Sequence, residues 1–262
     1  MLLALDVGNT NTVLGLYQLD VEPPQLAAHW RVTTHRTQTV DEYGVFFVNL
    51  FEMHGLSPKQ VTHIIISSVV PPVESTLRQM CENYFQLEPL FVEPGIKTGM
   101  PILYENPAEV GADRIVNGVG AWERFGRVKG RPMIVVDFGT ATTFDAISAK
   151  GEYLGGAICP GVQISADALF QRAARLPRID VRKPPRIVGR TTVGAMESGL
   201  FYGYVGMVEG LVKRMADELG GHVVCVATGG LADVIAPETP LIHHVDPNLT
   251  LHGLRLVWER NQ

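Results

Sequence analysis

A short apolar run that ends in Asp-x-Gly occurs twice in this sequence. The first copy is residues 2–5 followed by Asp-Val-Gly at 6–8, and the second is residues 133–136 followed by Asp-Phe-Gly at 137–139. Asp137 follows Asp6 by 131 residues, which is half of the 262 residues in the chain. A repeat placed at half the chain length indicates a duplicated domain. We therefore expect two domains, over residues 1–126 and 127–262.

Each copy predicts a β-hairpin. In the first, residues 2–5 form a buried strand, Asp6 lies at its end, Gly8 permits a turn, and residues 13–17 form the return strand. A P-loop is excluded, because its glycine loop matches GxxxxGK[ST] and leads into a helix. Phosphates would meet the amides of the turn and the side chains at 9–12, and Asp6 could hold a Mg²⁺ ion. An ordinary Asn-rich turn is the alternative, because Asn, Asp and Gly favour turns.

The rest of the chain alternates strands with helices, which is typical of a mixed α/β fold. Thr39 and Glu42 have the spacing of a capping box before a helix over residues 43–54. Pro107 is expected to open a helix that continues to Phe125. Further strands are expected at 29–33, 63–70, 89–92, 153–158 and 223–227, and further helices at 73–85, 193–219 and 246–258.

Composition excludes several classes of protein. With 46% hydrophobic residues and a mean hydropathy of +0.12, the chain is expected to bury one large core or two modest ones. A net charge of −5 gives no overall basic field, so a nucleic-acid partner is not expected. The three cysteines are widely spaced, which argues against disulfides and fits a cytoplasmic protein. No signal peptide is expected, and no uncharged run approaches the ~20 residues that span a bilayer.

Two segments have an unusual composition. The predicted helix over residues 193–219 contains Gly199, Gly203, Gly206 and Gly210, although each glycine costs ~1 kcal/mol relative to alanine inside a helix. This spacing predicts a groove that another helix or a ligand approaches closely, either within the domain or between subunits. Residues 171–190 contain seven basic residues and one acid. A solvated loop and a region that attracts anionic ligands would both explain them.

Four motifs occur together along the chain: DVGNTNT at 6–12, GADR at 111–114, DFGTAT at 137–142 and TGGLA at 228–232. In combination they resemble the type III pantothenate kinases, a family of the actin, hexokinase and Hsp70 superfamily. The resemblance implies two duplicated actin-like (ribonuclease H-like) domains with mixed sheets and an interdomain ATP cleft. It also implies ATP-dependent phosphorylation of the terminal hydroxyl of pantothenate to 4′-phosphopantothenate, the first step of coenzyme A biosynthesis.

The same resemblance implies roles for single residues. Asp113 is the expected catalytic base, which accepts the proton of the attacking hydroxyl. Arg114 would bind the pantothenate carboxylate, for which a planar guanidinium is suited. Asp137 would bind K⁺ or NH₄⁺, and Asp6 would bind Mg²⁺ or another divalent cation, directly or through water. The implied ATP contacts are Asp6, Val7, Gly8, Asn9, Thr10, Asn11, Thr12, Val13 and Thr140, and the implied pantothenate contacts are Tyr104, Gly111, Ala112, Asp113, Arg114 and Thr192, with Thr191 an alternative to Thr192.

Cations at these positions make physical sense, because Asp6, Asp113 and Asp137 would otherwise repel a polyphosphate. Simple pairing with an arginine is the alternative for Asp113 and for Asp137. The resemblance further implies a homodimer with the acceptor pocket at the subunit interface, and no membrane partner. Two other functions stay open: a related phosphotransferase that acts on another small acceptor, and a non-enzymatic accessory factor of transcription. The GADR motif argues against the first, and the three aspartates argue against the second.

Overall fold

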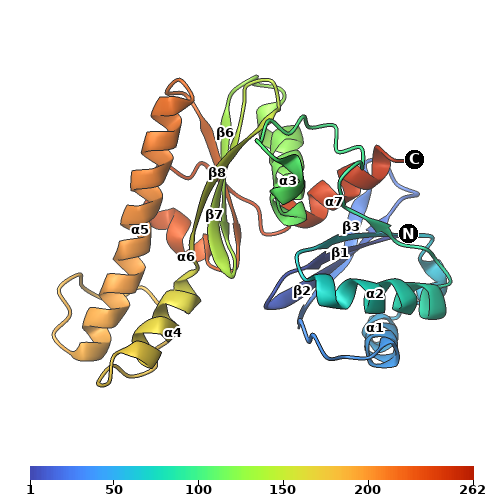
Figure 1. Ribbon diagram of the computed structural model, residues 1–262, viewed down its shortest axis with the longest axis horizontal. Helices are drawn as coiled ribbons and strands as arrows, with labels where there is room; N and C mark the ends of the chain where they lie inside the picture. The colour runs from blue at the N-terminus through green and yellow to red at the C-terminus, as the bar shows by residue number, and fades with distance from the viewer. The chain divides into compact units, whose positions relative to one another are not determined.

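The computed structural model describes residues 1–262, which form two compact units (Figure 1). Unit 1 contains Met1–Gly99, Asn106–Gly120 and Thr250–Gln262. Unit 2 contains Met100–Glu105 and Ala121–Leu249. The chain therefore passes into unit 2 and returns to unit 1 for its last residues. Each unit is built around one five-stranded sheet.

A mixed sheet forms the centre of unit 1. Its strands are β1 (Leu2–Val7), β2 (Asn11–Gln18), β3 (Gln25–Thr33), β4 (His63–Ser68) and β5 (Leu90–Phe91). They lie in the order β3-β2-β1-β4-β5. β2 is antiparallel to both β1 and β3, whereas β4 is parallel to β1. The first predicted hairpin is thus confirmed as β1 and β2.

Helices cover both faces of this sheet. On one face, α1 (Val40–Met53) and α2 (Pro71–Met80) share a buried apolar core with β1 and β4. The predicted capping box is confirmed, because the Glu42 N–H donates to the Thr39 hydroxyl and the Glu42 carboxylate accepts the Thr39 N–H. On the other face lies α7 (Leu249–Glu259), where a methyl group added at Gly15 would lie 2.8 Å from Leu251 Cδ1.

The sheet of unit 2 repeats this arrangement. Its strands are β6 (Met133–Phe138), β7 (Ala141–Ile147), β8 (Tyr153–Pro160), β9 (Val224–Gly229) and β10 (His244–Val245). They lie in the order β8-β7-β6-β9-β10, with β7 antiparallel to its two neighbours and β9 parallel to β6. Strand for strand, this is the order and direction of the first sheet. The duplication expected from the repeated Asp-x-Gly hairpins is therefore confirmed.

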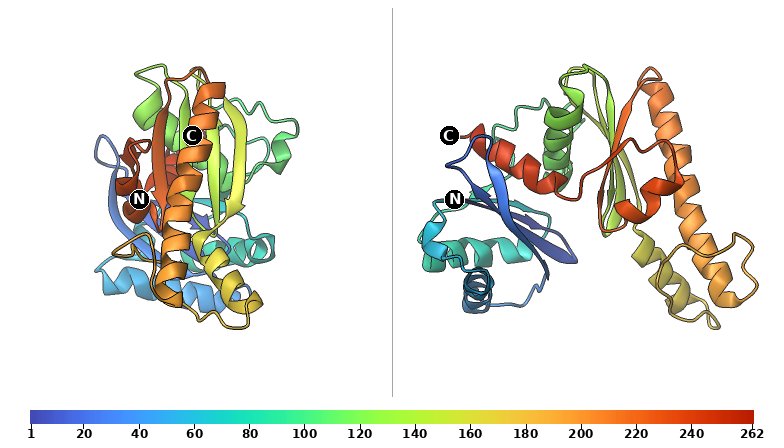
Figure 2. Two further views of the ribbon diagram at one scale, coloured as in Figure 1. Left: turned by 90° about the vertical axis from the view of Figure 1, so that its left-hand side faces the viewer. Right: turned by 180° about the vertical axis from the view of Figure 1, so that it is seen from behind.

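Three helices lie on one face of the second sheet: α4 (Val162–Arg172), α5 (Thr192–Glu218) and α6 (Ala232–Ile235) (Figures 1 and 2). The long helix α5 runs along the strands and contributes a row of buried apolar side chains to the core of this unit. Asp137 and Asp145 lie on the opposite face of the sheet, so they do not pack against these three helices. None of the helices combines the length and the apolar character that a membrane crossing needs.

Two predicted helices need correction, and one helix was not predicted. Pro107 opens only the short 3₁₀ helix Pro107–Glu109, and α3 (Ala112–Ala121) begins after an extended Val110, so the single predicted helix was wrong. α4 was not predicted, because Pro160 and Gly161 come directly before it, and a Pro-Gly pair is typical of a turn or loop. The last helix begins at Leu249 rather than at Asp246, since the Asp246 carboxylate accepts the Asn248 N–H at 3.0 Å and holds a turn there.

Candidate functional site

The turn of the first hairpin is closed by hydrogen bonds from the turn itself and from the segment after β3. The Gly8 N–H donates to the Asn11 carbonyl at 3.0 Å, and a methyl group at Gly8 would lie only 3.0 Å from the same oxygen. The Thr34 hydroxyl donates to the Gly8 carbonyl at 2.7 Å. The Thr34 N–H donates to the Thr10 carbonyl at 2.9 Å. The turn is therefore compact, and its shape favours glycine at position 8.

The predicted phosphate contacts differ in exposure. Asn9 and Thr10 are exposed, while Asp6, Gly8, Asn11 and Val13 are half-buried and Val7 is buried. The Thr12 side chain is 1% exposed, and its hydroxyl lies 2.9 Å from the Thr34 hydroxyl. The buried Thr12 hydroxyl therefore stabilises the turn from its interior side. The accessible polar groups of the turn are those of residues 8–11.

The GADR motif lies beside the end of the first hairpin. A methyl group added at Gly111 would lie 2.6 Å from Asp113 Oδ1 and 3.6 Å from Val69 Cγ1. The Val69 N–H in turn donates to the Val7 carbonyl at 3.1 Å. Two motifs that are about a hundred residues apart in the sequence are thus brought together within unit 1.

Asp113 lies in the first turn of α3 and is half-buried. Its carboxylate accepts the Arg114 N–H at 2.8 Å. Burial raises the pKa of the Asp113 carboxyl above its ordinary value, while this hydrogen bond and the charge of Arg114 act to lower the pKa. A raised pKa makes a carboxylate a better proton acceptor near neutral pH. The Arg114 side chain is largely buried, with 8% of the residue exposed.

The second hairpin and the glycine turn after β9 meet at Asp137. Asp137 is the next-to-last residue of β6 and pairs with Thr228 of β9. Gly229 has a φ of +90°, and a methyl group there would lie 2.5 Å from Asp137 Oδ1. The Gly230 N–H donates to the Phe138 carbonyl at 3.1 Å. The structure therefore brings together the DFGTAT and TGGLA motifs within unit 2, and close packing requires glycine at position 229.

Thr140 and Thr192 are both exposed in unit 2. Thr140 lies in the turn of the second hairpin, where a methyl group at Gly161 would lie 2.1 Å from its carbonyl oxygen. Thr192 is the first residue of α5. The neighbouring Thr191 is the N-cap of this helix, and its hydroxyl accepts the Gly194 N–H at 3.0 Å. Capping uses the Thr191 hydroxyl as an acceptor, and its O–H can still donate, so the structure leaves both threonines able to meet a ligand.

Tyr104 packs against β8. Its ring centroid lies 6.4 Å from that of Tyr153, and a methyl group at Gly155 would lie 3.2 Å from Tyr104 Cε2. The Tyr153 N–H donates to the Pro101 carbonyl and the Leu103 N–H donates to the Tyr153 carbonyl, both at 2.8 Å. The segment that carries Tyr104 is therefore attached to the edge of the second sheet through one residue, Tyr153.

Asp145 supports this arrangement, although sequence reasoning assigns it no role. It is 0% exposed, and its carboxylate accepts the Tyr153 hydroxyl at 2.7 Å and the Thr143 hydroxyl at 3.1 Å. A buried carboxylate needs such donors, because burial of an unpaired charge is costly. The signal in the sequence is an acid in the middle of an otherwise buried strand, ATTFDAI.

Asp6 has one polar neighbour on the adjacent parallel strand, Ser67. No group of three or more His, Cys, Asp or Glu side chains is arranged to hold a metal. Ser67 pairs with Asp6 across β1 and β4, is 0% exposed, and has a hydroxyl without a hydrogen-bond partner. Few protein ligands are typical of Mg²⁺, which commonly takes one or two carboxylates together with phosphate oxygens. Ser67 could not be predicted as a neighbour of Asp6, because in the sequence it is only a residue near the end of an apolar strand.

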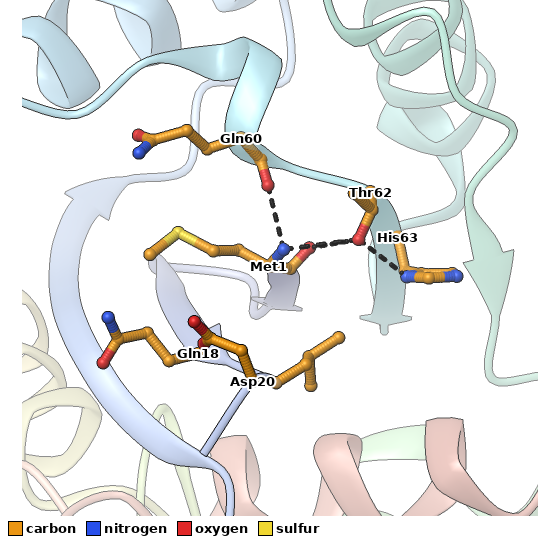
Figure 3. Close-up of a pocket in the computed structure, with 7 residues that line it drawn as sticks. Met1, Gln18, Asp20, Gln60, Thr62 and His63 are labelled. Atoms are coloured by element: carbon orange, nitrogen blue, oxygen red, sulfur yellow. Dashed lines mark hydrogen bonds between the residues drawn. The ribbon is translucent and has the colours of Figure 1, made fainter.

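A pocket of about 550 Å³ lies elsewhere in unit 1 (Figure 3). It is at the start of β1, the end opposite Asp6, and its floor includes the Met1 ammonium, which donates to the Gln60 carbonyl at 2.9 Å. The lining residues are Met1, Gln18, Leu19, Asp20, Gln60, Thr62 and His63. None of the residues predicted to bind ATP or pantothenate lines this pocket.

Comparison with known proteins gives a consistent result. The family profile described as type III pantothenate kinase matches residues 2–214. The type III pantothenate kinase of Koribacter versatilis is 59% identical, with 100% of this chain and 96% of that protein covered. Among solved structures, a Campylobacter jejuni protein described as a Baf family transcriptional activator has a TM-score of 0.63 at 19% identity, covering 99% of this chain and 98% of that one. The inorganic polyphosphate/ATP-glucomannokinase of Arthrobacter sp. strain KM has a TM-score of 0.52 at 13% identity, covering 99% and 98%. At these identities the two structures bear on the fold alone.

Proposed function

The chain belongs to the family of type III pantothenate kinases and is a pantothenate kinase, and from this premise we propose how its residues carry out the reaction. The enzyme uses ATP to phosphorylate pantothenate, which gives 4′-phosphopantothenate in the first step of coenzyme A biosynthesis. Phosphoryl transfer requires a protein mainly to position the reactants and to stabilise charge. The observation that carries the proposal is the meeting of the first hairpin with the GADR motif in unit 1, through Val69 and Gly111.

Asp113 is the base in this proposal. As the terminal hydroxyl oxygen of pantothenate bonds to the γ-phosphorus of ATP, its proton passes to the Asp113 carboxylate, and ADP leaves with the electrons of the broken P–O bond. The raised pKa of Asp113 suits this role, because the proton is held more strongly than by an ordinary carboxylate. The hydrogen bond from the Arg114 N–H keeps the carboxylate in position.

The acceptor is recognised mainly by charge. Arg114 binds the pantothenate carboxylate, since a guanidinium offers two parallel donors to the two oxygens. Gly111 and Ala112 let the acceptor approach the backbone next to Asp113. Tyr104, which rests on Tyr153, and Thr192, which has its hydroxyl outside the N-cap bond, supply the remaining contacts.

The first hairpin binds the phosphates of ATP through the amides and polar side chains of its turn, and Thr140 of the second hairpin contacts the nucleotide. Asp6 would hold Mg²⁺ or another divalent cation, and Asp137 would hold K⁺ or NH₄⁺. Ser67, which pairs with Asp6 across β1 and β4, has a hydroxyl without a hydrogen-bond partner. When bound, these cations neutralise part of the phosphate charge and so reduce its repulsion from the aspartates. Glycine at position 229 is consistent with a cation-binding role for Asp137, because a larger residue there would displace the Asp137 carboxylate.

We propose a cytoplasmic homodimer in which α5 packs against a partner. Gly199, Gly203 and Gly206 lie in the interior of α5, and a methyl group added at any of them would meet no atom within 4 Å. No contact within the chain therefore explains these glycines, which lower the stability of a helix. Close approach of a second helix does explain them, because glycine lets two backbones pack closely.

The activity is tested by incubating the purified protein with ATP, Mg²⁺, K⁺ and pantothenate, and by identifying the product by mass spectrometry. The expected product is 4′-phosphopantothenate, and the rate is expected to fall when Na⁺ replaces K⁺. Parallel reactions contain a sugar or acetate as the acceptor. Turnover of one of those acceptors with no phosphorylation of pantothenate would overturn the proposed function, and equal rates in Na⁺ and K⁺ would overturn the role of Asp137.

A further inference from the structure

The proposed phosphate-binding turn has no positive charge of its own. Residues 6–13 contain one charged side chain, the carboxylate of Asp6, and neither lysine nor arginine. Neutral amides and hydroxyls can hydrogen-bond to a triphosphate, but a charge-assisted bond is roughly twice as strong as a neutral one. A cation from another segment would therefore contribute strongly to nucleotide binding at this turn.

Strand pairing brings such a cation to the turn. Asn11 of β2 pairs with Thr33 of β3, so the residues that follow β3 lie next to the turn. Thr34 is bonded to the backbone of the turn at two points, as described above. Two residues later, Arg36 is exposed, and its Nη2 donates to Asn9 Oδ1 at 2.8 Å.

This contact also fixes the orientation of Asn9. A guanidinium can only donate, so the oxygen of the Asn9 amide must face Arg36, and the Nδ2 group is left as a donor. Of the five N–H groups of Arg36, one donates to Asn9 and the others can donate to a ligand. The pair therefore presents only donors to whatever binds at the exposed side of the turn, which is the pattern that suits phosphate oxygens.

We propose that Arg36 binds the phosphate chain of ATP and supplies the positive charge that residues 6–13 lack. The inference rests on the proposed function only in taking ATP as the phosphate donor of the reaction. Thr34 sets the position of the segment, Arg36 carries the charge, and Asn9 orients the guanidinium.

The test is isothermal titration calorimetry of ATP and of adenosine, without pantothenate, on the full chain and on Arg36→Gln and Arg36→Lys. Loss of one charge-assisted hydrogen bond is expected to weaken ATP binding by about tenfold or more. Adenosine binding is expected to stay unchanged, and Arg36→Lys is expected to retain part of the ATP affinity. Lys59→Gln is the matched control, because Lys59 is an exposed cation at the opposite end of the first sheet. Its ATP affinity should equal that of the wild-type protein.

A second comparison tests whether Arg36 binds ATP directly or only stabilises the turn through its hydrogen bond to Asn9. Asn9→Ala removes the partner of Arg36 but keeps its charge. Direct binding predicts that Arg36→Gln weakens ATP binding further in the Asn9→Ala background. The proposal would be overturned if Arg36→Gln left ATP affinity unchanged, or if it weakened adenosine and ATP binding equally. It would also be overturned if Arg36→Gln caused no further loss of ATP affinity in the Asn9→Ala background. Because no acceptor is present, a failure of pantothenate phosphorylation would leave these results unaffected.

Discussion

The pKa of Asp113 links its proposed role to the stability of the protein. Its folded-state pKa is raised above the ordinary value of 3.8 by burial. The unfolded chain therefore loses this proton at a lower pH than the folded chain, and ionisation of Asp113 favours unfolding. The stability that Asp113 contributes is fully present below the unfolded-state pKa and is lost as the pH rises through the folded-state pKa.

Asp113→Asn is consequently expected to leave the free energy of unfolding at pH 7 unchanged or to increase it. Relative to the wild-type protein, the variant should gain stability as the pH rises from below 3.8 through the raised pKa. Urea denaturation over this pH range measures the difference. A wild-type protein that gains stability over the variant as the pH rises would show that the Asp113 pKa is lowered, not raised.

Gly229 offers a test of the second hairpin at the scale of one residue. Gly229→Ala places a methyl group 2.5 Å from Asp137 Oδ1 at a φ of +90°, which is expected to cost about 1–3 kcal/mol of stability. It is also expected to abolish stimulation by K⁺, because the carboxylate must move. The matched control is Gly230→Ala, where the methyl group meets nothing within 4 Å. Thermal melts and rates in K⁺ and Na⁺ that are the same for both variants would contradict the close contact at Asp137.

The motifs predict residues within the two hairpin turns and the GADR turn, because each motif is local in the sequence. They do not predict Thr34, which helps to close the first turn from outside DVGNTNT. Ser67, Asp145 and Arg36 lie outside these motifs. Each acquires its setting from strand pairing: Ser67 from β4 against β1, Asp145 from β7 against β8, and Arg36 from β3 against β2. No motif or periodic pattern in the sequence around these three residues predicts which side chains they contact.

At the scale of elements, the glycines of α5 give opposite expectations for a free helix and a paired one. In a free exposed helix, Gly203→Leu would increase stability by up to ~1 kcal/mol, because leucine has a higher helix propensity than glycine. In a helix packed closely against a partner, the same change is expected to convert the dimer to a monomer. Glu218→Leu adds the same exposed side chain at the last residue of α5 and is the control.

Sedimentation velocity of the two variants decides between these expectations. We predict a dimer for the wild-type protein and for Glu218→Leu, and a monomer for Gly203→Leu. A dimer of unchanged affinity in Gly203→Leu would rule out α5 as the interface.

Elements with strong local signals were predicted well, and those with weak signals were not. The capping box before α1 and the long periodic pattern of α5 identify both helices. Pro107 is compatible with a long helix and with a single 3₁₀ turn, and the structure has the single turn, with an extended Val110 before α3. That break places Asp113 in the first turn of α3, whereas it would lie inside a helix that ran from Pro107 to Phe125.

At the scale of the whole molecule, the half-chain repeat was sufficient to predict the duplicated architecture. Both sheets have the same strand order, and each Asp-x-Gly aspartate has a hydroxyl residue beside it on the parallel strand, Ser67 in one and Thr228 in the other. The packing of α7 on the first sheet could not be predicted, because its contacts join Gly15 to Leu251 and Val116 to Gly253. Nothing local to either segment indicates such a pairing.

We propose above all that Asp113 is the base of this pantothenate kinase. The most direct test of this proposal is the rate of pantothenate phosphorylation by Asp113→Asn beside the wild-type protein, with ATP binding by both measured by calorimetry. We predict unchanged ATP binding and a fall in kcat of about 10²–10⁴-fold, the typical contribution of a positioned base. A folded Asp113→Asn that binds ATP and phosphorylates pantothenate at the wild-type rate would contradict it.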